Sequence, residues 1–108
     1  MDWTHNVQLW LTNDYGFYQF VQERIADIVG DSWHPCNNTE ENVSEALSIL
    51  ASEFGTYFGA LLDEQAADMS PIFREWLDAA FHSVNWDRIV EYWTEEVAEA
   101  AYNMAERN

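Results

Sequence analysis

The sequence predicts an all-α protein: a compact, single-domain bundle of about five helices without a sheet. Apolar residues recur every three to four positions along most of the chain, which is the period of an amphipathic helix. The chain has 108 residues, of which 48% are hydrophobic, and that is enough for one domain with one core. No repeat, low-complexity stretch or long linker divides it, so residues 1–108 are expected to form one acidic helical domain.

The first two helices are expected at about 3–11 and 15–29. Asn13 ends the first, and Asp14 is the expected N-cap of the second. Gly30 is the expected C′ residue of the second helix. The apolar face of the first helix consists of Trp3, Val7, Trp10 and Leu11. The residues that the second helix should bury are Phe17, Phe20, Val21, Ile25 and Ile28.

A loop rich in Gly, Pro and Asn precedes a long third helix, expected at about 40–66. Thr39 is its expected N-cap, with Glu40 and Glu41 favourably placed in the first turn. Gly55 and Gly59, four positions apart, indicate either close packing against another helix or a kink. The apolar row of this helix is Val43, Leu47, Leu50, Phe54, Tyr57, Phe58 and Leu61.

The last two helices have clear start signals. Ser70 as N-cap and Pro71 at the first helical position begin a helix that runs to about Ser83. Asn85 is the expected cap of the final helix. The fourth helix should bury Ile72, Phe73, Trp76, Leu77, Ala80 and Phe81. The final helix should bury Trp86, Ile89, Val90, Trp93, Val97, Ala101 and Met104.

The charge of the chain is strongly one-sided. Twenty Asp and Glu stand against four Arg and no Lys, which gives a net charge of −16. Direct binding to nucleic acid or to an anionic membrane needs a basic face, so we expect a basic protein as partner. No apolar run approaches the roughly 20 residues of a membrane span, and no signal peptide is recognisable. The single cysteine, Cys36, excludes an intramolecular disulfide, and a cytoplasmic location is expected.

Catalytic and metal-binding patterns are weak. His5, His34 and His82 are scattered, and the one Cys lies two positions from His34, which is not a zinc spacing. Packing within the loop is the favoured interpretation. Asp78 and His82 share a helix face, where a surface ion pair is favoured over an acid–base dyad. No nucleophile elbow, P-loop or dinucleotide motif is present, so we expect no enzyme, no cofactor and no metal.

A row of carboxylates follows the polar side of the final helix: Asp87, Glu91, Glu95 and Glu99. Like charges four positions apart repel by a few tenths of a kcal/mol per pair. Each step climbs about 6 Å along a helix, which approximates the spacing of phosphates on a DNA strand. We therefore take this row as the first candidate for partner binding. The second candidates are Glu40, Glu41, Glu45, Glu23 and Asp27.

Two other interpretations of the acidity remain open. A polar helix face is normally charged, although it usually mixes both signs. Proteins of salt-saturated cytoplasms are also rich in Asp and Glu and poor in Lys. The aromatic residues are ambiguous as well. Trp10, Trp76, Trp86 and Trp93 have core spacing, and Trp33 lies in the loop. Tyr15, Tyr18, Tyr92 and Tyr102 lie at face edges, where they could anchor a basic partner or a homodimer.

Two segments resemble small proteins of phages and mobile elements whose activity is undefined. The first has the pattern W-x-x-x-V-x-L-W-L-x-N-D, carried here by Trp3, Val7, Leu9, Trp10, Leu11, Asn13 and Asp14. The second is an amphipathic helix followed by V-[ND]-W-x-x-I, carried by Leu77, Ala80, Val84, Trp86 and Ile89. The resemblance covers about half of the chain and implies a genomic setting without catalytic residues. In size, charge and helicity the chain is also similar to acidic helical DNA mimics.

These observations favour a phage-type inhibitor of a host defence system. Carboxylate rows would take the place of phosphates on the Lys and Arg of a CRISPR effector or restriction enzyme in the host cytoplasm. The alternative is an acidic structural or regulatory interaction module of a halophile or its virus, in which the charge serves solubility.

Overall fold

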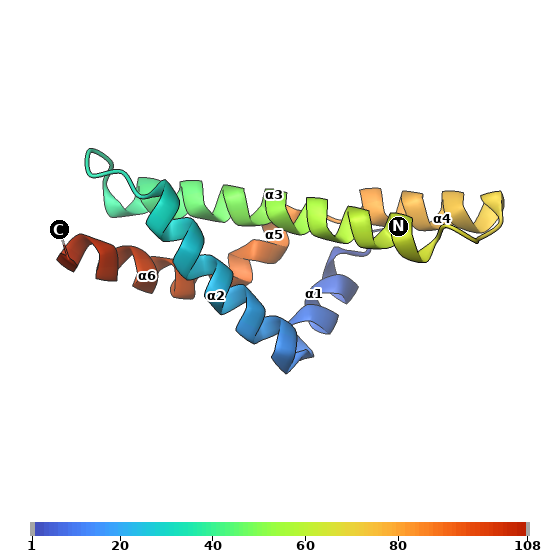
Figure 1. Cartoon of the computed structure of the whole chain (residues 1–108), viewed down its shortest axis with the longest axis horizontal. Helices are drawn as coiled ribbons and strands as arrows, with labels where there is room; N and C mark the ends of the chain where they lie inside the picture. Colours follow the sequence, from blue (N-terminus) through green and yellow to red (C-terminus); the bar gives the residue numbers. More distant parts are fainter. Residues whose placement is uncertain (1, 108) are drawn as a thin grey trace.

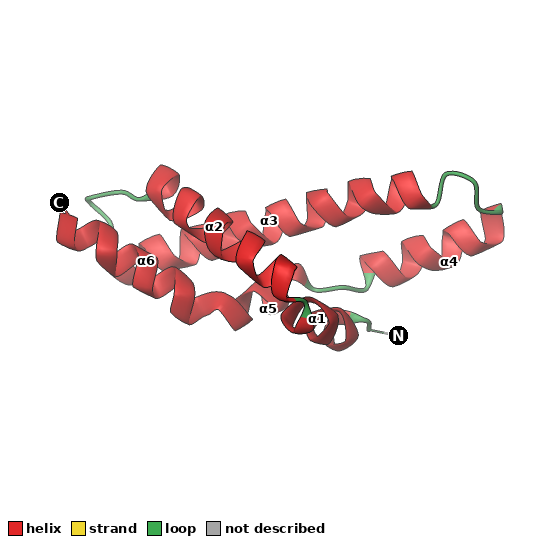
Figure 2. Ribbon diagram, turned by 60° about the horizontal axis from the view of Figure 1, so that its bottom comes forward, coloured by secondary structure: helices red, strands yellow, loops and turns green. Residues whose placement is uncertain are grey.

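The computed structural model describes residues 2–107, which form an all-α fold (Figure 1). The elements are α1 (Thr4–Asn13), α2 (Tyr15–Ser32), α3 (Thr39–Gln65), α4 (Pro71–His82), α5 (Trp86–Val90), a 3₁₀ turn (Glu91–Trp93) and α6 (Thr94–Arg107). No strand occurs between residues 2 and 107 (Figure 2). The predicted fold class is confirmed.

Side-chain caps begin three of the helices. The carboxylate of Asp14 accepts the N–H of Phe17 at 3.0 Å, and the Asn85 side chain accepts the N–H of Arg88 at 3.1 Å, as predicted. The cap of α3 lies one position before the predicted one. Asn38 is the N-cap, because its extended backbone lets its side-chain oxygen accept the N–H of Glu41 at 2.8 Å.

The end of α2 also differs from the prediction. Gly30 lies inside the helix with an ordinary negative φ, so it is not a C′ residue. The helix continues to Ser32, whose hydroxyl donates to the carbonyl of Ile28 at 2.7 Å. It ends where Trp33 turns to an extended conformation, with its N–H still bonded to the carbonyl of Val29 at 2.9 Å. Trp33 packs against the core.

The core lies between α2, the first half of α3 and the α5–α6 segment. Trp93 is its largest fully buried side chain, and its ring lies 5.6 Å from that of Phe54 and 6.4 Å from that of Phe17. The predicted buried side of the final helix is confirmed for Ile89, Val90, Trp93, Val97 and Ala101. Phe20 was predicted to be buried, but its side chain is exposed. Its ring lies 6.2 Å from that of Tyr57, which is also exposed.

The final helix is not the single regular helix that its periodicity predicts. The 3₁₀ turn at Glu91–Trp93 separates α5 from α6, and the path changes direction there (Figure 1). The Thr94 hydroxyl donates to the carbonyl of Glu91 at 2.7 Å and so stabilises the tight turn. A 3₁₀ turn rotates the chain by about 120° per residue instead of about 100°. Residues before and after it therefore do not share one helical wheel.

The molecule measures 54 × 26 × 23 Å because α3 is long and α4 folds back along its second half. This α3–α4 hairpin projects away from the core (Figure 2). The prediction that α4 buries six apolar residues is wrong: α4 has no buried residue. One of its sides is held to α3, where the Arg74 guanidinium pairs with Asp63 and, at 3.4 Å, with Asp78. Within residues 2–107, no third helix covers Ile72, Phe73 and Trp76, which are exposed.

Two glycines let aromatic rings approach α3 closely. A Cβ at Gly55 would lie 3.4 Å from the indole of Trp86, and one at Gly59 would lie 3.4 Å from the ring of Phe81. The interpretation of close packing is therefore confirmed at both positions. These contacts attach the α4–α5 connection to the middle of the long helix.

Candidate functional site

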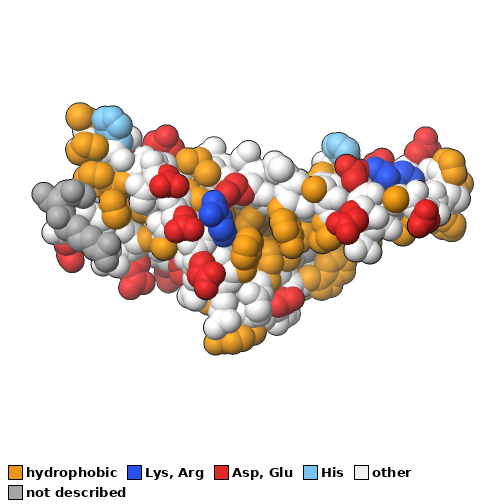
Figure 3. Space-filling view, viewed as in Figure 1, with side chains coloured by type: hydrophobic (Ala, Val, Ile, Leu, Met, Phe, Trp, Pro, Cys, Tyr) orange, Lys and Arg blue, Asp and Glu red, His pale blue; other side chains and the backbone are white. Residues whose placement is uncertain are grey.

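The acidic side chains contribute little to the core. Glu53, Asp78 and Glu96 are half-buried, and the other Asp and Glu residues are exposed. Figure 3 shows carboxylates spread over the visible face of the molecule. All nine residues predicted to bind a partner are exposed. The fold therefore leaves nearly all of this negative charge available to other molecules.

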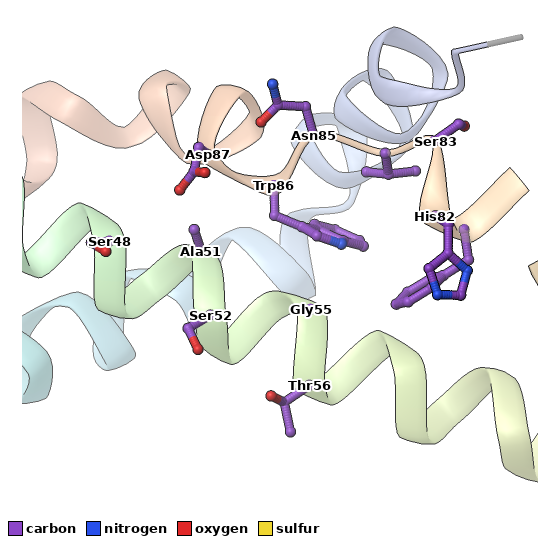
Figure 4. A pocket seen from close by; sticks show the side chains of 12 residues that line it. Ser48, Ala51, Ser52, Gly55, Thr56, His82, Ser83, Asn85, Trp86 and Asp87 are labelled. Carbon is purple, nitrogen blue, oxygen red and sulfur yellow. The ribbon is translucent and has the colours of Figure 1, made fainter. Parts of the chain in front are cut away.

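The four-residue row does not run along one face. Asp87 lines an open cleft together with Ser48 and Ser52 of α3 (Figure 4). Glu99 instead borders Gln22 and Ala26 of α2. The two ends of the row thus face different neighbours, because the path from α5 to α6 passes through the 3₁₀ turn. The regular wheel, which predicts one row that drifts gradually around a single helix, therefore does not hold across the 3₁₀ turn.

Carboxylates of two neighbouring helices form what we call the α2–α6 acidic surface, which consists of Glu23, Asp27, Glu95, Glu96 and Glu99. Glu99 lies beside Gln22 and Ala26, which directly precede Glu23 and Asp27 in α2. Glu95 lies one turn before Glu99 in α6. The Tyr18 hydroxyl donates to Glu96 at 2.9 Å and joins α2 to α6. This hydrogen bond to a carboxylate raises the pKa of the Tyr18 phenol.

A second acidic group stands at the start of α3. Glu40 and Glu41 are in its first turn, where their negative charges interact favourably with the helix dipole. Glu45 follows one turn later. The start of α3 and the end of α6 lie at the same end of the molecule (Figures 1 and 2). These three carboxylates therefore extend the acidic character toward the end opposite to α4.

Arginine neutralises only parts of this surface. Arg24 pairs with Asp27 at 3.4 Å and with Glu53 of α3 at 2.5 Å, so Asp27 is the partly compensated member of the α2–α6 acidic surface. Arg74 is held between Asp63 and Asp78 in the hairpin. Near the N-terminus, hydrogen bonds from Thr4, above all from its hydroxyl at 2.5 Å, lower the pKa of Asp2, and the charge of Arg88 adds to the effect.

The cleft beside Asp87 is open and rich in hydroxyl groups. It has a volume of about 840 Å³ and lies between α3 and the α4–α5 connection, with Thr56, His82 and Asn85 also on its walls (Figure 4). The predicted Asp78–His82 ion pair is wrong: His82 Nδ1 lies 2.6 Å from the backbone oxygen of Asp78, while the Asp78 carboxylate pairs with Arg74. The cleft can accept hydrogen bonds and donate them.

The loop that contains His34 and Cys36 is held by hydrogen bonds, and both side chains are exposed. The side chain of buried Asn42 accepts the N–H of His34 at 3.0 Å and donates to its carbonyl at 3.2 Å. The N–H of Cys36 donates to His34 Nδ1 at 3.2 Å. Within residues 2–107, no three His, Cys, Asp or Glu side chains are grouped as a metal site would require.

The structure also shows an apolar groove that the sequence did not predict. It has a volume of about 560 Å³ and lies between α1, the second half of α3, and α4. Figure 3 shows hydrophobic side chains gathered in the hollow between α1 and α3. Trp10 lines the groove and is 62% exposed, and Trp76 on α4 is 63% exposed, so their prediction as core residues is wrong. Trp86 and Trp93 do pack in or against the core.

Amphipathic periodicity is the signal that could have found this groove. Taken alone, it favours burial within the chain, because a sequence does not show which apolar stripes find a partner helix. The tyrosines agree better with the prediction: Tyr15, Tyr92 and Tyr102 are exposed.

The N-terminal segment and the α4–α5 connection contact each other at this groove. The N–H of Asn85 donates to the buried hydroxyl of Thr4 at 2.8 Å, and the N–H of Trp3 donates to the Ser83 hydroxyl at 3.2 Å. Trp3 and Val7 of the first segment and Val84 of the second line the groove. These contacts fix the angle of α1 against the hairpin.

Comparison with protein-family models, curated proteins and solved structures finds no match to this chain. Among residues 2–107, no helix combines the length and apolar character that crossing a bilayer requires. The function is therefore inferred from the surfaces themselves.

Proposed function

We propose that this chain is a protein-binding inhibitor that mimics DNA. It occupies the Lys- and Arg-lined nucleic-acid site of a host defence protein, either a CRISPR effector or a restriction enzyme of the cell that a phage infects. The observation that carries the proposal is the exposure of nearly all carboxylates on a helical scaffold whose core does not use them.

The α2–α6 acidic surface is the first candidate for the contact. It combines carboxylates from two packed helices, so the backbone positions of its charges are fixed before binding and only the side chains are ordered on contact. The exposed rings of Tyr92 and Tyr102 on the same chain segment offer contact area for the stems of Lys and Arg.

The mechanism is competitive exclusion. The net charge of −16 accelerates encounter with a basic site, and each carboxylate–Lys or carboxylate–Arg contact takes the place of a phosphate contact. The chain needs neither cofactor nor metal for this action. The complex should weaken steeply as salt screens the charges.

The test is displacement of labelled duplex DNA from a panel of CRISPR effectors and restriction enzymes, followed by fluorescence anisotropy at about 50 and about 500 mM NaCl. We expect one member of the panel to lose its DNA to the wild-type chain at low salt, with a sharply higher inhibition constant at high salt. The Glu95→Lys/Glu99→Lys variant should lose the inhibition. The matched control is Glu64→Lys/Asp68→Lys, which reverses two exposed charges near the far end of α3 and should retain it.

Two results would contradict the proposal. One is an inhibition constant that stays flat between the two salt concentrations. The other is equal inhibition by the α6 variant and the wild type, with both folded by circular dichroism.

A further inference from the structure

The α3–α4 hairpin leaves an apolar surface without a cover. Its members come from α1, the end of α3, the α3–α4 turn and α4: Leu9, Trp10, Leu61, Met69, Ile72, Phe73, Trp76 and Leu77. Trp10, Leu61 and Leu77 line one groove, and the other members lie on the same elements or on the turn between them. Monomeric proteins rarely leave a large apolar patch exposed, and such a patch marks an interaction site. We call it the hairpin apolar surface.

We propose that the hairpin apolar surface binds a second copy of this chain, with α4 packed antiparallel against α4 of the other copy. The two α3–α4 hairpins then pack against each other as four helices with a shared apolar core. This inference is independent of the proposed inhibition, because it concerns a different surface of the molecule.

The apolar stripe of α4 is self-complementary in this arrangement. A two-fold axis between positions 76 and 77 places Phe73 opposite Ala80 of the second copy, so that a large and a small side chain meet. The same axis places Trp76 opposite Leu77 of the second copy. Interdigitation of large and small side chains along such a seam is how antiparallel helices pack.

The charges of α4 do not oppose this contact. Asp78 is turned toward Arg74 at the α3 side of the helix. Helical periodicity places Glu75 next to that side and away from the stripe of Phe73, Trp76 and Ala80. The carboxylates of the two α4 helices would therefore remain outside the shared core, in water.

The exposed area is close to what a stable dimer needs. Trp10, Phe73 and Trp76 are each more than half exposed, and together they leave on the order of 350 Å² of ring surface in water. The five aliphatic members roughly double this, while a standard interface buries about 800 Å² per partner. The half-buried walls of the groove, such as Phe58, supply the remainder.

The large like charge of the two copies opposes association over long distances and makes it depend on salt. Added salt screens this repulsion without weakening the apolar contact, so the dimer tightens as salt rises. Binding of a basic target has the opposite dependence. The two proposals therefore fail independently of each other.

The test is sedimentation velocity of the full chain over a wide concentration range at about 50 and about 500 mM NaCl. We expect a dimer whose Kd falls roughly tenfold at the higher salt. Trp76→Glu should raise the Kd by more than about tenfold, because it places a charge in the centre of the seam. The matched control Tyr102→Glu alters an equally exposed aromatic residue on α6, at the other end of the molecule, and should leave the Kd unchanged.

Each other outcome overturns the inference. A wild-type chain that is monomeric at every concentration and at both salts excludes the second copy as occupant. A dimer that Trp76→Glu does not weaken places the interface elsewhere. Loss of fold is not a concern for this variant, because the Trp76 side chain is 63% exposed and α4 buries no residue, and circular dichroism verifies it. A monomer that binds a Leu/Lys amphipathic helical peptide, but not its scrambled form, assigns the groove to a basic partner instead.

Discussion

The backbone N–H of Asn85 donates a hydrogen bond of 2.8 Å to the hydroxyl of Thr4, a side chain that is 2% exposed. The bond connects residues 81 positions apart and joins the start of α1 to the start of α5. The same hydroxyl donates to Asp2. Thr4 thus fixes the position of α1, which forms one wall of the apolar groove.

We predict that Thr4→Val lowers the free energy of unfolding by about 1–2 kcal/mol, because the N–H of Asn85 loses its acceptor while the shape of the side chain is kept. Urea denaturation measures this loss. Thr12→Val is the control: the Thr12 hydroxyl bonds only within its own helix, to the carbonyl of Gln8 at 2.9 Å, so a change below about 0.5 kcal/mol is expected. Equal losses in the two variants would refute the assigned role of Thr4.

The Tyr18–Glu96 hydrogen bond should make stability depend on alkaline pH. The pKa of Tyr18 is raised in the folded state, so this contribution is complete below the ordinary phenol pKa of about 10. It is lost as the pH rises through the higher folded value. Tyr18→Phe should therefore lower the urea midpoint at neutral pH and remove this alkaline decline. An absorbance titration of tyrosinate should also lose its latest component in Tyr18→Phe and keep it in Tyr102→Phe.

Two glycines should respond to substitution with opposite signs. Gly30 lies inside α2 with nothing within 4 Å of the position that a Cβ would take, so Gly30→Ala should stabilise the chain by about 0.5–1 kcal/mol through helix propensity. At Gly55 the first added carbon already touches the indole of Trp86. Gly55→Val should therefore destabilise by about 1–3 kcal/mol through overpacking. Thermal and urea unfolding of both variants measure the signs, and a stable Gly55→Val protein would contradict the close contact.

Salt separates mimicry from adaptation to a saline cytoplasm. The exposed carboxylates repel one another, so the melting temperature should rise between dilute buffer and molar KCl. A DNA mimic from an ordinary host is already folded in dilute buffer, since its core contains Trp93, Phe54 and their neighbours. Circular dichroism that shows an unfolded chain in dilute buffer and a folded one in molar KCl would favour the halophile alternative.

Much of the fold could be predicted from local patterns. The start of α2 at Asp14, of α4 at Ser70–Pro71 and of α5 at Asn85 follows from residues whose preferred conformations are set within three or four positions. The buried side of the last helical segment also follows, because Ile89, Val90 and Val97 repeat with the helical period. The exposure of the nine candidate binding residues agrees with the polar positions assigned to them.

The remainder depended on contacts that no local pattern encodes. The tight turn at Glu91–Trp93 ends on Trp93, whose ring lies between those of Phe17 and Phe54, and it separates Asp87 in α5 from Glu95 and Glu99 in α6. Trp10 and Trp76 have the spacing of core residues, but periodicity shows only that a stripe is apolar and not what covers it.

The sequence by itself determined most of the helices, the caps at Asp14 and Asn85 and the net charge of −16, because propensity and net charge are properties of short segments and of composition. Only the tertiary structure decided that Glu96 and Glu99 of α6 lie against α2, and that α4 presents Phe73 and Trp76 to solvent. The physical reason is that a side chain is buried only when a second element lies opposite it. In this fold, α3 covers only one side of α4.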